Sequence, residues 1–324
     1  MLVAEENPAR VRPRVKRLHR LGTALALALL PLSALSPLLA PGLFSTPDGL
    51  FHIFRAVALE AALREGNLYP RWAPDFVQGL GYPIFNFYAP LANYLQVALH
   101  WLGLANVEAL KAATALAFVG SGATMYVFAR DLLGHRGALL AAAAYVYAPL
   151  MFTEAYVRGD LPEHLALALL PLVLWALRRL VDRPTVGRLA LGGLLYATLV
   201  VTHNLVGFFG SPLLALYAVA LVVWGRRWRA LPFVVAALAL GLGLSAFFWL
   251  PALGEKEWVQ IGRLIDGPSW DFRLHFGTFA ELFGLEMPID VSQGNAQPGA
   301  YRLGLGQVLL AGLGLAALAP GRPR

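Results

Sequence analysis

The chain has 324 residues, of which 58% are hydrophobic and 14% charged, and its mean hydropathy is +0.61. A soluble domain is nearer to half apolar and a quarter charged, and it cannot hide this much apolar surface from water. The composition excludes a soluble enzyme, a nucleic-acid-binding protein and a disordered chain, and it indicates an integral membrane protein. The absence of cysteine excludes disulfides and thiolate sites.

The formal net charge of +7 is concentrated before the first apolar run. Residues 1–20 contain six Lys or Arg residues and two Glu residues, so they carry +4 of this charge. A basic segment directly before an apolar run is retained in the cytoplasm. We therefore predict a basic cytoplasmic tail at residues 1–20, followed by a single transmembrane domain at residues 21–324.

The apolar runs predict helices, because backbone polar groups in lipid must be satisfied within their own segment. The runs cover residues 21–43, 85–104, 109–129, 137–157, 165–180, 188–203, 205–224, 231–252 and 303–319. All later basic clusters fall on the cytoplasmic side if exactly one run before Arg130 does not cross. The weakest candidate is the run 85–104, which contains Asn, Gln and His residues, and we predict that it is an interfacial or re-entrant segment. The predicted fold is all-α, a polytopic transmembrane helical bundle of about eight spans, with interfacial helices in a long first extracytoplasmic loop.

This topology predicts three extracytoplasmic loops, at about residues 44–106, 158–164 and 253–302, and it places the turn His203–Asn204 on the same side. The cytoplasmic loops are short and basic, so any chemistry is expected on the extracytoplasmic side. The loop 253–302 has many charged residues without a specific spacing, and a lid over a site is one interpretation of it.

The first loop opens with the start of a helix over residues 45–66. Thr46 can cap it, Pro47 suits its first turn, and Asp48 favours the positive end of the helix dipole. On this helix Asp48, His52 and Arg55 form one stripe, and we expect an amphipathic helix at the membrane surface. Two interpretations stay open. In one, Asp48 is a base and Arg55 a phosphate ligand; in the other, Asp48 is only a cap and Arg55 binds lipid headgroups.

Residues 67–91 add Arg71 and Tyr88 to a segment dense in aromatic residues, proline and glycine. Aromatic rings and asparagine are common in sugar sites, and a belt at the membrane interface would explain the rings equally well.

The segment 158–164 brings Arg158, Asp160, Glu163 and His164 together between two apolar runs. Ionisable groups at the edge of a span are costly unless they are paired or functional. Either a functional role or an internal Arg158–Glu163 ion pair explains them. His203 and Asn204 interrupt a long apolar stretch, as a turn or as substrate contacts.

Several common motifs are absent. The sequence has no P-loop, no dinucleotide fingerprint and no HExxH motif, and its seven histidines are scattered. We therefore predict no metal site from the residues themselves.

The runs 47–55, 66–72 and 79–91, followed by Arg158-Gly159-Asp160 through Glu163, resemble a group of bacterial polytopic proteins that carry a 6-pyruvoyl-tetrahydropterin synthase-related domain. That group is more distantly similar to GT-C glycosyltransferases and to YfhO-like membrane proteins. The resemblance implies a bacterial inner-membrane protein with a cytoplasmic N-terminus, and it covers most of the chain. Because many relatives continue through further helices, we expect a short homologue or an N-terminal fragment.

GT-C enzymes use polyprenyl-phosphate-linked sugars, and an acidic residue early in their first extracytoplasmic loop is the usual catalytic or metal-binding position. Asp48 matches that position, although the usual second acid next to it is replaced by Gly49. The resemblance thus implies a glycosyltransferase in which Asp48, Asp160 and Glu163 are catalytic. It also leaves room for a divalent cation.

In this hypothesis the substrate contacts are the remaining polar residues of these segments, namely His52, Arg55, Arg71, Tyr88, Arg158, His164, His203 and Asn204. The partners are membrane lipid and a polyprenyl-phosphate sugar donor, and no nucleic acid. The alternative is a non-enzymatic membrane protein that binds or transports a lipid-linked or anionic compound.

Overall fold

A computed structural model of the chain describes residues 21–260, 262, 273, 276, 278–283 and 302–318. The predicted tail 1–20 and most of the predicted loop 253–302 lie outside these residues. The described part is helical, and its only β pairing is an isolated antiparallel bridge between Ala73 and Tyr82. The prediction of an all-α membrane protein is confirmed.

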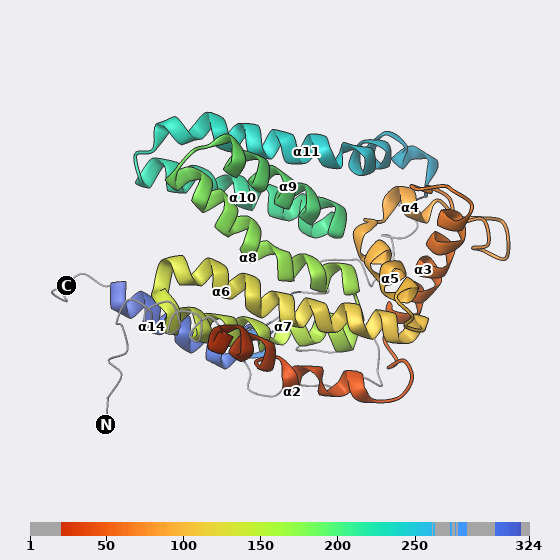
Figure 1. The fold of residues 1–324 in the computed structure, drawn as a ribbon, viewed down its shortest axis with the longest axis horizontal. Coiled ribbons are helices and arrows are strands. Elements are labelled where there is room, and N and C mark those ends of the chain that lie inside the picture. Colours follow the sequence, from red (N-terminus) through yellow and green to blue (C-terminus); the bar gives the residue numbers. More distant parts are fainter. Residues whose placement is uncertain are drawn as a thin grey trace, which may run out of the picture.

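Five helices in the described part are long and apolar enough to cross a bilayer. They are Leu21–Leu39, α6 (Asn106–Val146), α8 (Leu161–Asp182), α10 (Asn204–Trp224) and Trp228–Gly254, which contains α11 (Leu231–Gly254). Two further apolar helices are shorter, α9 (Val186–Thr202) and α14 (Leu305–Leu318). Helix α8 packs on α6 and α9, and α9 packs on α11, so these helices run side by side along the molecule (Figure 1).

The smaller elements complete the described part. They are α2 (Leu32–Leu35), the 3₁₀ turns Ser36–Leu39, Trp228–Ala230 and Lys256–Trp258, and α13 (Phe279–Phe283).

Helix α6 contains the break predicted between the runs 109–129 and 137–157. Gly134 has a φ of 72° and a ψ of −173°, so two helices meet at a kink there. The second of them ends at Val146 and not at residue 157 as predicted. The reason is Pro149, which has no N–H and cannot continue the helix. It begins α7 (Pro149–Phe152), and a π-helical turn, Thr153–Arg158, follows.

The run 85–104 does not form one helix. It is divided by Pro90 into α4 (Ile84–Phe87) and α5 (Leu91–Trp101). The 11 residues of α5 rise about 16 Å, roughly half the hydrocarbon thickness of a bilayer. As a single helix this segment is too short to cross, and both its interfacial role and the count of eight spans stay predictions.

Helix α3 (Gly49–Arg64) lies within the predicted range 45–66 and begins two residues after Pro47, the predicted first helical position. The Thr46 hydroxyl accepts from the Gly49 N–H at its start, and Gly66 has the left-handed conformation after its last turn. Large apolar side chains of α3 are exposed and its polar stripe faces the protein interior, as expected for a helix beside lipid and not for one in water. The inward face carries His52, and its apolar residues Ala56 and Leu59 pack in one cluster with Phe85 and Val97. The outward face carries the exposed side chains Leu50, Phe51, Phe54 and Val57. The polar stripe is therefore turned into the protein.

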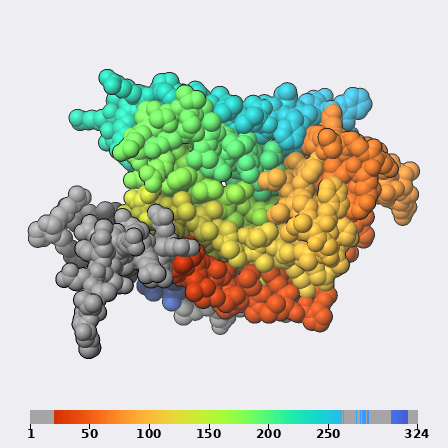
Figure 2. Space-filling view, viewed as in Figure 1, coloured from red at the N-terminus to blue at the C-terminus, as the bar shows by residue number. Residues whose placement is uncertain are grey.

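The two ends of the molecule differ in which elements and charged residues they contain. At the end formed by the α6 kink and the α8–α9 and α10–α11 turns, Arg179 pairs with Asp131 and Arg227 with Asp182. Helices α3, α4 and α5 cover the opposite end, on the right in Figures 1 and 2. A positive-inside topology requires this arrangement, and the sidedness itself stays a prediction.

Candidate functional site

The first loop is tied directly to the segment before α8. The Asp48 N–H donates to the Arg158 carbonyl oxygen at 3.0 Å. Gly159, the residue after Arg158, has a φ of +72°. A Cβ on Gly159 would overlap the Thr46 hydroxyl and would lie 3.1 Å from Gly49 N. Glycine is therefore needed here both for the backbone conformation and for the close approach of α3.

Replacing Gly159 with alanine should release α3 from this contact. The left-handed backbone costs about 1–2 kcal/mol for alanine, and forced overpacking adds about 1–3 kcal/mol. Gly66→Ala is the matched control, because Gly66 also has a positive φ (+87°) but has no atom within 4 Å of an added Cβ. Thermal unfolding of the purified protein should show the larger loss for Gly159→Ala. Equal losses would contradict the packing argument.

Arg158 connects three carboxylates. Its Nη1 donates to Glu154 Oε2 at 2.8 Å and to Glu163 Oε2 at 2.7 Å, and its Nη2 donates to Asp160 Oδ2 at 3.2 Å. The predicted Arg158–Glu163 ion pair is thus present within a larger network. Glu154 was missed from sequence because it lies inside an apolar run. The signal that could have found it is a carboxylate four residues before Arg158, at a depth where an unpaired charge is costly.

Asp160 caps α8 and faces His203. Its Oδ1 accepts from the Glu163 N–H at 3.0 Å, and its Oδ2 lies 3.9 Å from His203 Nε2. His203 Nδ1 accepts from the Val206 N–H at 3.3 Å and so caps α10. Burial lowers the pKa of His203, so its ring is neutral. The proton is then on Nε2, toward Asp160.

The Asp48 carboxylate is not the cap of α3. The hydroxyl of Thr46 accepts from the Gly49 N–H at 3.2 Å, and the Asp48 side chain makes no capping hydrogen bond. Asp48 is half-buried. Burial raises its pKa, and the charge of Asp160 raises it further, while Arg158 and Arg55 oppose the rise. Asp48 is therefore a carboxylate without a capping role beside the Arg158 network.

His52, Arg55 and Tyr88 form the other side of the cluster. The Arg55 guanidinium lies 3.8 Å from the centroid of the Tyr88 ring, and the His52 and Tyr88 rings are 6.2 Å apart. Burial, with Arg55 adding to it, lowers the pKa of His52 to about 3, so this ring is neutral. It lies beside the Gly159 backbone, but neither of its nitrogens makes a well-formed hydrogen bond. Arg55 Nη1 is also buried, and the described part of the chain offers it no acceptor.

We call this group of residues the acidic cluster; its members are Asp48, His52, Arg55, Tyr88, Glu154, Arg158, Asp160, Glu163 and His203. The cluster contains more carboxylates than cations. The carboxylates are Asp48, Glu154, Asp160 and Glu163, and the guanidinium groups are those of Arg55 and Arg158. An excess of carboxylate raises the pKa values of its members and so favours proton acceptance, and it leaves to a phosphate only a guanidinium donor that no carboxylate already binds. The arrangement suits a base better than it suits a clamp for phosphate on Arg158.

Asp160, Glu163 and His203 place ligand atoms within 4.8 Å of one another, close enough to share one cation. Two features oppose such a cation. Arg158 already bonds to both carboxylates, and the capping bond of His203 leaves a proton, and not a lone pair, on Nε2. Because ligands must present lone pairs, the donor set as arranged does not fit a resident divalent cation.

Three predicted substrate contacts are not members of the acidic cluster. His164 is buried and packs edge-on against Phe118, with ring centroids 4.4 Å apart. Asn204 begins α10 next to His203 and is half-buried. Arg71 bonds to Asn86 and Glu255. Sequence could not indicate the Arg71–Glu255 pair, because 184 residues separate its members.

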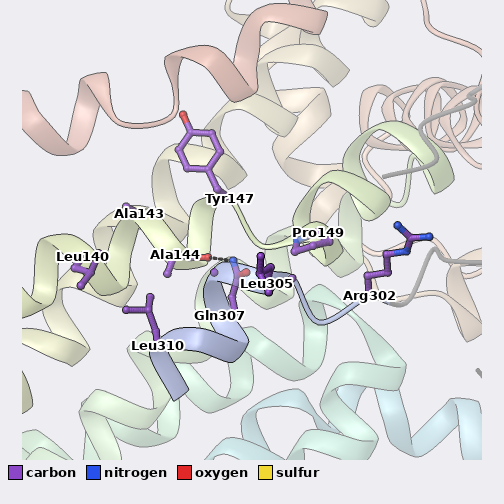
Figure 3. Close-up of a pocket in the computed structure, with 11 residues that line it drawn as sticks. Leu140, Ala143, Ala144, Tyr147, Pro149, Arg302, Leu305, Gln307 and Leu310 are labelled. Carbon is purple, nitrogen blue, oxygen red and sulfur yellow. Dashed lines mark hydrogen bonds between the residues drawn. The ribbon is translucent and has the colours of Figure 1, made fainter. Parts of the chain in front are cut away.

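Apolar grooves lie between the helices. One of about 280 Å³ runs between α5, α6, α8 and α9. Its lining includes Leu91, Leu165 and Thr202. In the chain, Leu91 follows Tyr88, Leu165 follows Glu163, and Thr202 precedes His203. Another of about 450 Å³ separates α6 from α14. In it, Gln307 donates to the Ala144 carbonyl at 2.7 Å, while Arg302 extends away from the apolar lining (Figure 3). Such grooves suit lipid chains.

Residues 85–266 match the model of a family described as 6-pyruvoyl-tetrahydropterin synthase related domain, membrane protein. The match contains Arg158, Asp160 and His203, and α3 lies before it. A protein of Lactococcus lactis subsp. cremoris (strain MG1363), described as an uncharacterized protein, is 22% identical over 239 residues. These residues are 71% of this chain and 38% of that protein, so the chain spans less than half the length of this relative.

Proposed function

The chain belongs to the 6-pyruvoyl-tetrahydropterin synthase related family of membrane proteins, and we propose that it is a GT-C-like glycosyltransferase of the bacterial inner membrane. It would move a sugar from a polyprenyl-phosphate carrier to an extracytoplasmic acceptor. The observation that carries this proposal is the state of Asp48. Its carboxylate has no capping role, its pKa is raised, and it lies beside the network of Arg158 and Asp160.

In the proposed reaction Asp48 takes the proton of the acceptor hydroxyl. The hydroxyl oxygen forms the new bond to the anomeric carbon, and the bond from that carbon to the phosphate oxygen breaks. The carrier phosphate leaves with the electron pair. A raised carboxylate pKa supports this role, because a base works best when its pKa is near the working pH. The chain's own part is to hold the base and to exclude water.

Arg55 is the group best placed to meet the leaving phosphate. Its Nη1 is buried and has no acceptor among the described residues, and its guanidinium lies 3.8 Å from the centroid of the Tyr88 ring. A donor fixed in advance in a water-poor site stabilises developing negative charge strongly. Arg158 is less suited to this role, because its donors already bond to three carboxylates.

The carrier lipid would lie in the groove between α5, α6, α8 and α9. The groove is lined almost entirely by apolar side chains, and its lining residues Leu91, Leu165 and Thr202 come within three residues of Tyr88, Glu163 and His203 in the chain. A lipid chain between the spans would then place its phosphate at the level of Arg55.

The proposal is tested in a bacterial strain that lacks the protein. The lipid-linked sugars and the surface glycans of this strain should change, with the unused donor increased, and the intact gene should restore both. Mass spectrometry of the extracted lipids provides the measurement. Unchanged profiles in the deletion strain would exclude the proposed transfer.

The same strain tests the groove. Gly120→Phe should fill it, because an added Cβ at Gly120 meets only the Ala168 Cβ, at 3.9 Å. We expect this variant to be made in normal amount and to restore the glycan at least tenfold less well, since the lipid chain loses its place. Gly243→Phe is the control, because Gly243 is exposed on α11 with open space around it. Full function of Gly120→Phe would remove the groove from the proposal.

A non-enzymatic protein that binds a lipid-linked or anionic compound is the second candidate function. The unpaired Nη1 of Arg55 favours it, since a buried cationic donor needs an acceptor whether or not chemistry follows. In that case Arg55→Ala should weaken binding, whereas removal of the Asp48 carboxylate should have little effect.

A further inference from the structure

A second polar site lies beside the acidic cluster, in a pocket of about 400 Å³ between the first loop and the end of α11. Its lining includes Arg71, Trp72, Asn86, Phe87, Glu255 and Trp258. This volume is within the range of small-ligand pockets, which combine apolar walls with a few fixed polar groups.

The polar groups of the pocket are fixed by one another. Arg71 Nε donates to Asn86 Oδ1 at 2.8 Å, Asn86 Nδ2 donates to Glu255 Oε2 at 3.0 Å, and Arg71 Nη2 pairs with Glu255 Oε1. Each member of this triad therefore bonds to the other two. The Asn86 side chain is buried, whereas those of Arg71 and Glu255 reach solvent. Both charged residues keep further hydrogen-bonding capacity toward the pocket.

The charges of the triad indicate the kind of ligand. The Arg71 guanidinium is neutralised by Glu255, so the site has no net charge to offer to a phosphate. It instead presents donors and acceptors side by side. A hydroxyl both donates and accepts, so a polyhydroxylated neutral compound matches the triad better than an anion does.

Two indole rings form the apolar part. Trp72 is 53% exposed and Trp258 is 86% exposed. The Trp72 ring lies on the backbone of Gly81, where an added Cβ would overlap the indole, and Gly81 has a φ of +80°. The ring is thus held in place while about half of the Trp72 side chain stays accessible. Apolar C–H faces of pyranose rings pack on aromatic faces of this kind.

We infer that this pocket binds a saccharide, with the triad bonding to hydroxyl groups and the tryptophan rings covering the sugar face. The inference rests on the proposed function, because it assigns the sugar or acceptor that the transfer would use. The short helix α4 connects the two sites. Asn86 belongs to the triad, and Tyr88, two residues later, contacts Arg55. Two residues span at most about 7 Å, which is within the reach of a bound sugar.

Binding can be measured without any transfer. The full-length protein in lipid nanodiscs is mixed with glucose, mannose, galactose or N-acetylglucosamine, and saturation-transfer NMR reports the bound sugar. We expect binding of at least one of these sugars, and we expect Trp72→Ala and Trp258→Ala each to weaken it about tenfold. The matched controls are Trp228→Ala and Trp224→Ala, which remove rings that are 59% and 84% exposed in the turn from α10 to α11.

Two outcomes would overturn the inference. One is no saccharide binding by the intact protein. The other is an equal loss in the control variants, as expected if all these rings only anchor the protein at the membrane interface. Asp48→Asn should retain saccharide binding, so the failure of this inference can be told apart from the failure of the proposed transfer. Inorganic phosphate should not displace the sugar, and displacement would count against a neutral ligand.

Discussion

Replacing Asp48 with asparagine should lower glycosyl transfer by about 10²–10⁴-fold, the usual contribution of a general base. The change removes the proton acceptor but keeps the size and polarity of the side chain. It should leave the start of α3 intact, because the Thr46 hydroxyl is the cap. The measurement is recovery of the lipid-linked glycan profile in the deletion strain, with the amount of protein determined by immunoblot.

Two matched variants sharpen this test. Asp75→Asn removes an exposed carboxylate from the same loop and should be silent. Asp48→Ser should be as inactive as Asp48→Asn if the carboxylate is a base, and as active as the intact protein if the protein only binds its ligand. Full activity of both Asp48 variants would reject catalysis by this residue.

The pKa of Asp48 adds a pH dependence. Only the ionised carboxylate accepts a proton, so activity should rise with pH through the pKa of this group. Burial and Asp160 raise this pKa above the ordinary value of 3.8, so the rise should lie at higher pH than for an exposed aspartate. The residual activity of Asp48→Asn should lack this limb of the profile.

Replacing Arg158 with methionine should destabilise the protein strongly. It leaves Glu154, Asp160 and Glu163 without their shared cation, and the Glu154 side chain is 2% exposed. Removing one partner of a fully buried ion pair costs about 3–5 kcal/mol, and because the Arg158 side chain is 37% exposed, we expect a loss no larger than the lower value. Thermal unfolding of the protein in detergent should show the loss.

Arg64→Met is the control for this variant, because Arg64 pairs with Glu60 at the same spacing of four residues but is mostly exposed. An exposed pair contributes about 0–1 kcal/mol, so this variant should unfold almost normally. If Arg158→Met is not made at all, adding Glu154→Gln and Glu163→Gln should restore it by removing two of the unpaired charges. Arg158→Met as stable as Arg64→Met would contradict the network.

The sequence predicts the helices well and the contacts between them poorly. Helical spacing put Asp48, His52 and Arg55 on one stripe, and the structure keeps that stripe and brings it to Arg158 and Asp160. The pattern does not say which way the stripe faces. In water a polar face points outward, whereas next to lipid the apolar face does, and Leu50, Phe51 and Phe54 take that position.

Other parts could not be predicted for different physical reasons. Glu154 is one charge within an apolar run, and averaging over the run conceals it. The second α6 segment ends at Val146 because of Pro149, whereas the predicted run 137–157 continued through this proline. Arg71 and Glu255 meet only because the first loop folds over the end of α11, and no local pattern encodes such a contact.

The two faces of α3 have a consequence for access to the interior. Its inner residues Ala56 and Leu59 pack on Phe85, its first turn is bonded to Arg158, and its outer face is suited to hydrocarbon. Swinging this helix away would break all of these contacts at once. We therefore expect helix α3 to keep its position, and a substrate to enter between other elements of the protein.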